Sequence, residues 1–158
     1  RIKLNFSFWF VFNRVFDALP ISAVIGNEYF CVHGGLSPYL LNLNDINKIE
    51  RPLSVFDDLI LSDILWTDPK SNFVGWGPNP RGNTKTWGYD IADCFLKYNK
   101  INYIIRGHQV ATDGFDFPFY PNKNVITVFT AAKYDFNKPN KAAIMLIDEN
   151  GENSFTVW

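Results

Sequence analysis

Two short apolar runs, each followed by histidine and glycine, constrain the fold of this chain most. The run YFCV at residues 29–32 leads into His33 and two glycines, and YIIR at residues 103–106 leads into glycine and His108. Apolar runs with β-branched residues predict buried strands, so each imidazole should project from a strand end. In α/β proteins the chemistry is placed where strand ends face loops. The two histidines are therefore predicted metal ligands, and the alternative is a pair of core histidines bonded to backbone carbonyls.

The remaining patterns mix helices and strands along the whole chain. Apolar residues three and four apart predict helices over residues 8–19 and 91–98, with shorter helical segments at 44–49 and 57–65. The predicted strands lie at residues 21–25, 29–32, 103–106, 125–130, 142–147 and 154–157. Gly26-Asn27 and Asn150-Gly151 predict hairpin turns. The mixture predicts an α/β fold of the α+β, mixed-sheet type, with two β-sheets flanked by helices.

Composition limits the classes of protein to which the chain can belong. A length of 158 residues, 47% of them hydrophobic, predicts one globular domain over residues 1–158. A net charge of −1 argues against a nucleic-acid-binding surface. The apolar segment 6–12 is too short to span a bilayer, so no membrane association is expected. Cys31 and Cys94 form no disulfide framework, which favours an intracellular location, cytoplasmic or nuclear.

Residues 67–86 contain proline, glycine, asparagine and serine without a periodic pattern, and they predict a long loop. Long structureless loops inside a compact domain are usually functional. Arg81 lies in this segment between proline and glycine, and its planar guanidinium suits bidentate capture of a phosphate. A solvated surface arginine is the alternative. Three tryptophans flanking the segment are expected to hold it against the body of the protein: Trp66, Trp76 and Trp87.

Three further positions have candidate roles. Arg106 directly precedes the second glycine–histidine pair and is expected to support that site structurally. Tyr134 follows the strand predicted at 125–130 and could place its hydroxyl in a cleft, although it could equally be an ordinary loop tyrosine. The acidic pair Asp57-Asp58 is expected to mark a helix N-terminus, with no catalytic role.

Several motifs occur in series from one end of the chain to the other. They are LPISAVI, YFCVHGGLSP, IERP, ILWTDP, GWGPNPRG, IIRGHQV and VFTAAKY. In this order and spacing the chain resembles the PPP family of protein serine/threonine phosphatases, within the type 1/type 2A group. The resemblance covers essentially the whole chain, and it implies the calcineurin-like metallophosphoesterase sandwich of two β-sheets flanked by helices.

The resemblance also implies roles for four residues. His33 is similar to the ligand of the family's HGG element and His108 to that of its R-[AG]-H-Q element, and both would bind the same metal ion. Arg81 is similar to the arginine that binds phosphate, and Tyr134 to the tyrosine that overlooks the cleft. Members of this family use two metal ions, manganese or iron with zinc, to polarise the phosphoryl group and activate a water.

The chain departs from the family pattern in two ways. Ala132, Lys133 and Asp135 stand around Tyr134 where the family has Ala-Pro-Asn-Tyr-Cys, which could shift the tyrosine loop. The family motifs GDxHG, GDxxDRG and GNHE do not occur in the sequence. They carry the ligands of the other metal, the bridging aspartate and the proton-donating histidine. The chain, which opens at Arg1, is therefore expected to be the carboxy-terminal part of a longer catalytic domain, with apolar strand faces left unburied.

Two functions follow as expectations. The first is metal-dependent hydrolysis of phosphoserine and phosphothreonine in protein substrates by a longer enzyme, with this chain inactive alone. The second is a non-catalytic relative, a truncated pseudophosphatase that binds other proteins. In either case regulatory or targeting protein subunits are expected partners. A metallophosphoesterase acting on nucleotides is disfavoured by the ILWTDP and HGGLSP motifs together.

Overall fold

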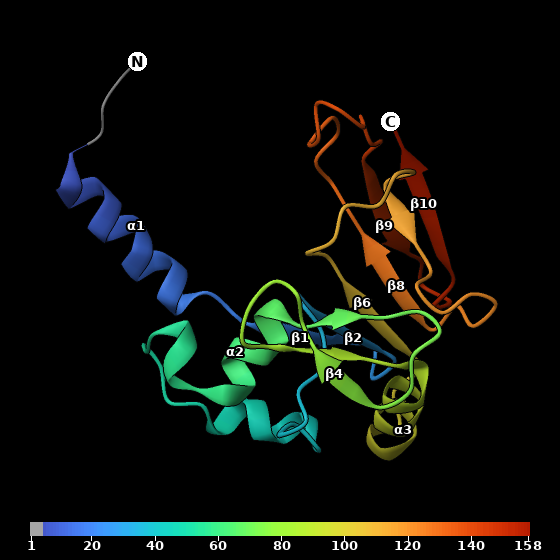
Figure 1. Cartoon of the computed structure of the whole chain (residues 1–158), viewed down its shortest axis with the longest axis horizontal. Helices are drawn as coiled ribbons and strands as arrows, with labels where there is room; N and C mark the ends of the chain where they lie inside the picture. The colour runs from blue at the N-terminus through green and yellow to red at the C-terminus, as the bar shows by residue number, and fades with distance from the viewer. Residues whose placement is uncertain (1–4) are drawn as a thin grey trace.

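A five-stranded mixed sheet organises the part of the chain that the computed structural model describes, residues 5–158 (Figure 1). Its strand order is β1-β2-β6-β8-β7. The strands are β1 (Ser22–Ile25), β2 (Tyr29–Val32), β6 (Tyr103–Arg106), β8 (Val125–Val128) and β7 (Phe115–Asp116). Strands β2, β6 and β8 are parallel, whereas β1 and β7 pair antiparallel at the two edges. The carboxyl ends of the three parallel strands therefore lie at one edge of the sheet.

A second sheet of three strands lies within the segment that the sequence predicted to be structureless. Its order is β3-β5-β4, with β3 at Asp68–Pro69, β4 at Trp76–Pro78 and β5 at Lys85–Trp87. The prediction of a long loop over residues 67–86 was wrong for these strands. Strands of two or three residues are too short to carry an alternating pattern, so only their pairing in space reveals them.

The third sheet is the hairpin of β9 (Ala143–Ile147) and β10 (Asn153–Val157), which lies beside β8 in Figure 1. The chain turns at Gly151, whose φ of 81° only glycine adopts readily. The Phe155 ring stacks on Phe115 with 4.0 Å between ring centroids, which joins the hairpin to the edge strand β7. Mixed sheets flanked by helices confirm the predicted fold class.

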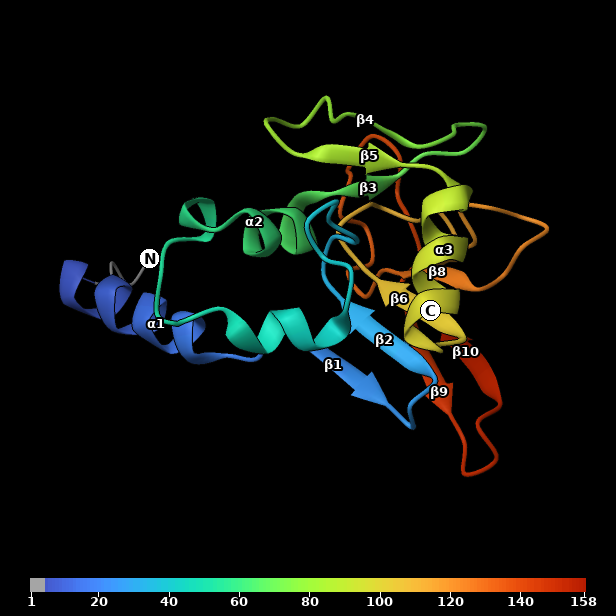
Figure 2. The same cartoon turned by 90° about the horizontal axis from the view of Figure 1, so that it is seen from below.

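The helices are α1 (Phe6–Ala18), α2 (Leu59–Trp66) and α3 (Tyr89–Asn99), with the 3₁₀ turns η1 (Leu43–Lys48) and η2 (Val55–Asp57). Helix α3 packs against β6 (Figure 2), where Phe95 meets Phe30 of β2 with ring centroids 5.6 Å apart. Asp58 accepts a hydrogen bond from the Leu61 backbone at the start of α2, as predicted for a helix N-terminus. The core is formed by buried side chains that include Phe30, Leu36, Ile64, Trp87, Ile104 and Val125.

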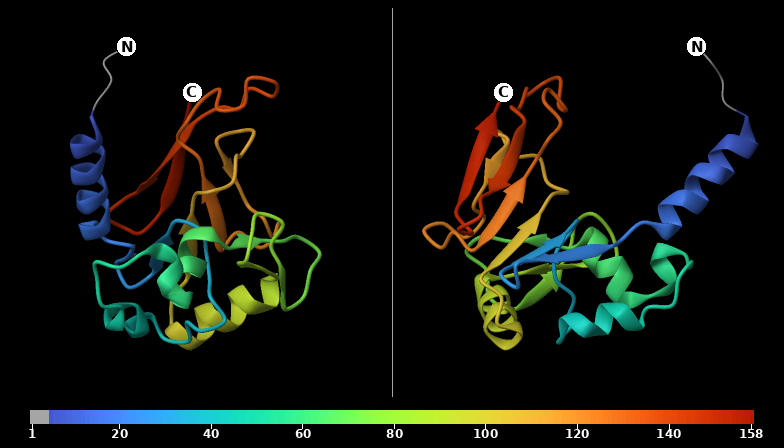
Figure 3. Two further views of the ribbon diagram at one scale, coloured as in Figure 1. Left: turned by 60° about the vertical axis from the view of Figure 1, so that its left-hand side comes forward. Right: turned by 180° about the vertical axis from the view of Figure 1, so that it is seen from behind.

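Helix α1 extends away from the sheets (Figure 3), and none of its residues is buried. The predicted helix is confirmed, but its large apolar side chains are all exposed. Arg51 holds its carboxyl end by donating hydrogen bonds to the backbone carbonyls of Leu19 and Asp17. Within residues 5–158, no helix combines the length and the apolar character needed to cross a bilayer.

Gly34 fixes the end of β2 against the end of α2. Its backbone N–H donates to the Ile64 carbonyl at 2.7 Å, and a Cβ at this position would lie only 2.6 Å from the carbonyl carbon of Leu65. Only glycine permits such a close approach of two backbones. This contact sets the direction in which the preceding residue, His33, leaves the strand.

Candidate functional site

His33 and His108 meet at the carboxyl edge of the five-stranded sheet. They follow the neighbouring parallel strands β2 and β6, which explains how residues 75 apart in sequence come together. Their ring nitrogens, Nε2 of His33 and Nδ1 of His108, are 3.2 Å apart. The backbone N–H of Gly107 also donates to the His33 carbonyl at 3.0 Å, so the two turns are joined through the main chain.

His108 has a left-handed backbone, with φ of 60°. Such a conformation is unusual for a residue other than glycine, and it occurs often where a side chain must be aimed for function. The next residue, Gln109, closes a tight turn by donating its backbone N–H to the Gly107 carbonyl at 2.7 Å. The turn directs the His108 imidazole toward His33 instead of along the strand.

Partial burial keeps both imidazoles neutral at physiological pH. It lowers the pKa of His33, and the Arg106 charge acts in the same direction. It also lowers the pKa of His108, to about 4. The neutral imidazole is the form that binds metal ions, because protonation occupies the ligating lone pair.

The separation of the two nitrogens fits one shared metal ion. Two nitrogens about 2.1 Å from a metal, with about 100° between the bonds, would lie about 3.2 Å apart. Nε2 of His108 is buried without a hydrogen-bond partner, so the ring is not held there by an ordinary structural contact. Among residues 5–158, no group of three or more His, Cys, Asp or Glu side chains could hold a metal ion. The described residues could therefore supply two ligands of such a site, His33 and His108.

Arg106 connects the turn after β2, which carries His33, to the turn after β6, which carries His108; these are the two histidine turns. Its Nε donates to the Gly34 carbonyl at 2.6 Å, and its Nη1 donates to Oε1 of Gln109 at 2.9 Å. Nη2 is paired with Oδ1 of Asp68 at 2.9 Å. Burial lowers the pKa of Arg106 to about 10, so it remains charged at neutral pH. These contacts agree with the structural role expected of Arg106, which is to hold the turns that carry the two histidines.

Arg81 lies in the loop between β4 and β5, where its Nε is 3.1 Å from Oδ2 of Asp68. Its side chain is 43% exposed, and the carboxylate it contacts is buried. Its backbone N–H donates to Oδ1 of Asn79 at 2.9 Å. The predicted phosphate-binding arginine is therefore connected to the histidine turns through Asp68 and Arg106. A cavity of about 220 Å³ opens beside it, lined by Phe56, Ser62, Trp66, Arg81, Gly82, Asn83 and Thr84.

Sequence reasoning missed two neighbours of the site. The Trp66 ring packs edge-on against His108, with 5.3 Å between ring centroids, so it contributes more than the loop packing predicted for it. Of the other two tryptophans, Trp87 is fully buried and Trp76 half-buried, as expected of side chains that hold the segment in place. Asp68, the second neighbour, is the aspartate of the ILWTDP motif. Nothing in its local pattern reveals that its partner Arg106 lies 38 residues away.

Tyr134 makes its contacts with residues other than the two histidines and Arg81. Its side chain is 66% exposed, and its ring packs edge-on against Phe129 at 5.4 Å between centroids. Its backbone N–H donates to Oδ1 of Asn140, which fixes the turn in which it lies. No hydrogen bond or ring contact joins it to His33, His108 or Arg81 in the described structure. Its role in catalysis stays a prediction.

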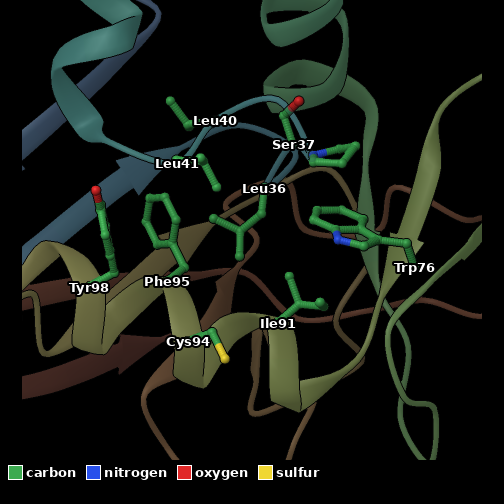
Figure 4. A pocket seen from close by; sticks show the side chains of 10 residues that line it. Leu36, Ser37, Leu40, Leu41, Trp76, Ile91, Cys94, Phe95 and Tyr98 are labelled. Carbon is green, nitrogen blue, oxygen red and sulfur yellow. The ribbon is translucent and has the colours of Figure 1, made fainter.

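An apolar cavity of about 250 Å³ lies between α3 and the loop that follows His33 (Figure 4). Leu36 and Leu40 form its loop side, and Ile91, Phe95 and Tyr98 form its helix side, with Trp76 closing one end. None of the residues that line it is charged. This cavity does not suit a phosphate, so the histidine cluster is the candidate site for phosphate chemistry.

Two comparisons place this geometry among known proteins. The family model described as calcineurin-like phosphoesterase matches residues 2–111, a range that includes His33, Arg81 and His108 but not Tyr134. A solved structure of a protein serine/threonine phosphatase from Saccharomyces cerevisiae, with similarity to human phosphatase PP5, matches 99% of this chain with a TM-score of 0.87. The two sequences are 27% identical over the match. The chain spans about half of that protein, 52% of its chain.

Proposed function

Because the chain belongs to the calcineurin-like phosphoesterase family, we propose that it forms part of a metal-dependent site that hydrolyses phosphoserine and phosphothreonine in proteins. The observation that supports this proposal most is the 3.2 Å approach of Nε2 of His33 to Nδ1 of His108. The likeness in fold to a serine/threonine phosphatase, at 27% identity, favours this substrate class over other phosphate esters.

Each residue of the cluster has a role in this proposal. His33 and His108 would hold one metal ion through neutral ring nitrogens, and manganese, iron and zinc are the candidates. Such an ion supplies Lewis-acid polarisation of a phosphoryl oxygen and an acidified water. Arg81 binds the phosphate oxygens with its partly exposed guanidinium and offsets their charge. Arg106 keeps both histidine turns in place through Gly34 and Gln109.

We further propose that the complete site includes residues outside this chain. The described residues supply two imidazole ligands, whereas a two-metal phosphoesterase site needs bridging carboxylates as well. The 158-residue chain alone should therefore release no phosphate from a phosphoserine peptide or an aryl phosphate in the presence of Mn²⁺. His33→Ala, purified in parallel, controls for contaminating phosphatases. Metal-dependent turnover by the chain that disappears in His33→Ala would overturn this part of the proposal.

The same shortage of ligands favours a second candidate function, a pseudophosphatase that binds other proteins without catalysis. The coding sequence upstream of Arg1 distinguishes the two functions. An open frame with the GDxHG and GNHE motifs supports the enzyme, and its full product should hydrolyse the phosphopeptide. A stop codon or an unrelated upstream exon supports the pseudophosphatase. Regulatory or targeting protein subunits and an intracellular location are part of both proposals, whereas protein substrates belong to the enzyme alone.

A further inference from the structure

Asp68 lies between two arginines with different surroundings. Its Oδ1 is 2.9 Å from Nη2 of Arg106, and its Oδ2 is 3.1 Å from Nε of Arg81. The Asp68 side chain is 6% exposed and the Arg106 side chain is fully buried, whereas that of Arg81 is 43% exposed. One buried carboxylate therefore joins a structural arginine to an arginine that solvent and ligands can reach.

The ion pair with Asp68 leaves both Nη groups of Arg81 without a hydrogen-bond partner. Nε lies 3.1 Å from Oδ2 of Asp68, and neither Nη group donates a hydrogen bond within residues 5–158. These two groups carry four of the five donor hydrogens of an arginine, arranged as the fork that matches two oxygens of a phosphate. The Arg81 charge is also felt at His108, where it helps to lower the pKa of the imidazole.

Asn79 fixes the backbone of the same loop. Its side-chain amide donates to the Trp66 carbonyl at 3.0 Å and to Oδ2 of Asp68 at 3.2 Å, and its Oδ1 accepts the Arg81 backbone N–H. The loop main chain and the Arg81 side chain are thus both attached to one buried carboxylate. A long arginine side chain on a loop would otherwise sample many rotamers.

We propose that Asp68 is the positioning residue of the site: it holds Arg81 by its Nε edge and leaves the two Nη groups directed to a phosphate beside the histidine pair. This inference rests on the proposed function for the identity of the anion, but the Asp68–Arg81 contact is testable without it. The competing role is a counter-ion for Arg106 alone. That role would leave Arg81 free to move.

The test is NMR relaxation of the arginine Nε–Hε groups in the 158-residue chain. Arg106 serves as the rigid reference, because its Nε donates to a buried carbonyl, and Arg14 as the mobile one, because it has no side-chain hydrogen bond within residues 5–158. In the wild-type chain the Arg81 order parameter should be near 0.8, as for a rigid group, and in Asp68→Asn it should fall below about 0.6. An Arg81 group as mobile as Arg14 in the wild-type chain overturns the proposal, whether or not Asp68→Asn folds.

A titration with inorganic phosphate, followed at the same Arg81 signal, tests the functional consequence. Asp68→Asn should weaken binding by about fivefold or more, because a bidentate contact depends on fixed geometry. Asp63→Asn is the matched control, since it changes another buried aspartate, one paired with Ser37 and not with Arg81. Equal phosphate affinity in wild type and Asp68→Asn contradicts the positioning role. A rigid Arg81 that does not respond to phosphate supports the positioning and overturns the phosphate assignment of the proposed function.

Discussion

At the scale of single residues, the histidine pair is the feature on which the proposed chemistry depends. Two neutral nitrogens 3.2 Å apart would repel through their lone pairs unless a proton or a metal ion lay between them. A hydrogen bond between the rings satisfies them when one ring carries its proton on this nitrogen. For both nitrogens to hold a metal ion, that proton would have to move to the other nitrogen of the same ring.

We expect His33→Ala and His108→Ala each to weaken the binding of Mn²⁺ to the chain by about 10- to 100-fold, because each removes one of two ligands. Isothermal titration at pH 7.5 measures the affinity. Since the pKa of both histidines is lowered in the folded chain, the wild-type affinity should begin to fall at a lower pH than it would for imidazoles of ordinary pKa. Arg81→Lys is the control, with unchanged Mn²⁺ affinity. Wild-type affinity in both alanine variants would remove the histidines from the metal site.

The sequence predicted site roles for the two histidines and for Arg81, because each of these residues lies beside glycine or proline in a motif that stands out. It could not predict Asp68, because an aspartate in a loop-like segment has no special pattern until Arg81 and Arg106 surround it in space. For Tyr134 the position after β8 was predicted, but the direction of the side chain was not. That direction depends on the turn held by Asn140.

At the scale of elements, the close contact between the turn after β2 and the end of α2 determines where His33 lies. A Cβ on Gly34 would meet the Leu65 and Trp66 backbone at 2.6 and 2.7 Å, so neither partner could adjust without moving the helix end. The neighbouring turn is more open. A Cβ on Gly107 would have its nearest contact at 3.7 Å.

Gly34→Ala should therefore destabilise the chain by about 1–3 kcal/mol, the usual cost of overpacking. The free energy of unfolding in urea measures this effect. Gly107→Ala is the matched control, for which we expect a change within about 0.5 kcal/mol. Equal stability of the two variants would show that the turn after β2 is not packed against α2 as described.

Long elements were predictable and short ones were not. Helix α3 shows its helical period in the sequence, and strands β2, β6 and β8 were recognised as apolar runs rich in β-branched and aromatic residues. Strands β3, β4 and β5 do not, because two or three residues define no period, and their geometry comes from pairing with one another. Trp87 illustrates the difference: it was predicted to hold a loop, and it lies in β5 with its side chain in the core.

At the scale of the whole molecule, α1 is the part least explained by its own contacts. The side chains of Phe8, Phe12 and Phe16 are each at least 50% exposed, although their spacing predicts a buried helix face. Exposed apolar surface of this kind binds hydrophobic probes and promotes association.

Replacing Phe8, Phe12 and Phe16 together with serine should lower the fluorescence of bound 1-anilinonaphthalene-8-sulfonate and reduce concentration-dependent association. The unfolding free energy should change by no more than about 0.5 kcal/mol per site, since exposed side chains contribute little to stability. Phe30→Ser, in the core, should instead cost about 3–5 kcal/mol. A large loss of stability in the triple variant would mean that α1 packs against the body of the protein in solution.

The buried Arg106 side chain, bonded to Gly34 and to Gln109, has one more consequence. Both histidine turns are ordered when the chain folds, so a metal ion arriving later does not meet the entropy cost of closing two loops. Because the turns are preorganised, the fold should persist after the metal ion dissociates. A chelator should then empty the site and leave the sheets intact, unlike a zinc finger, which unfolds when its ion is removed.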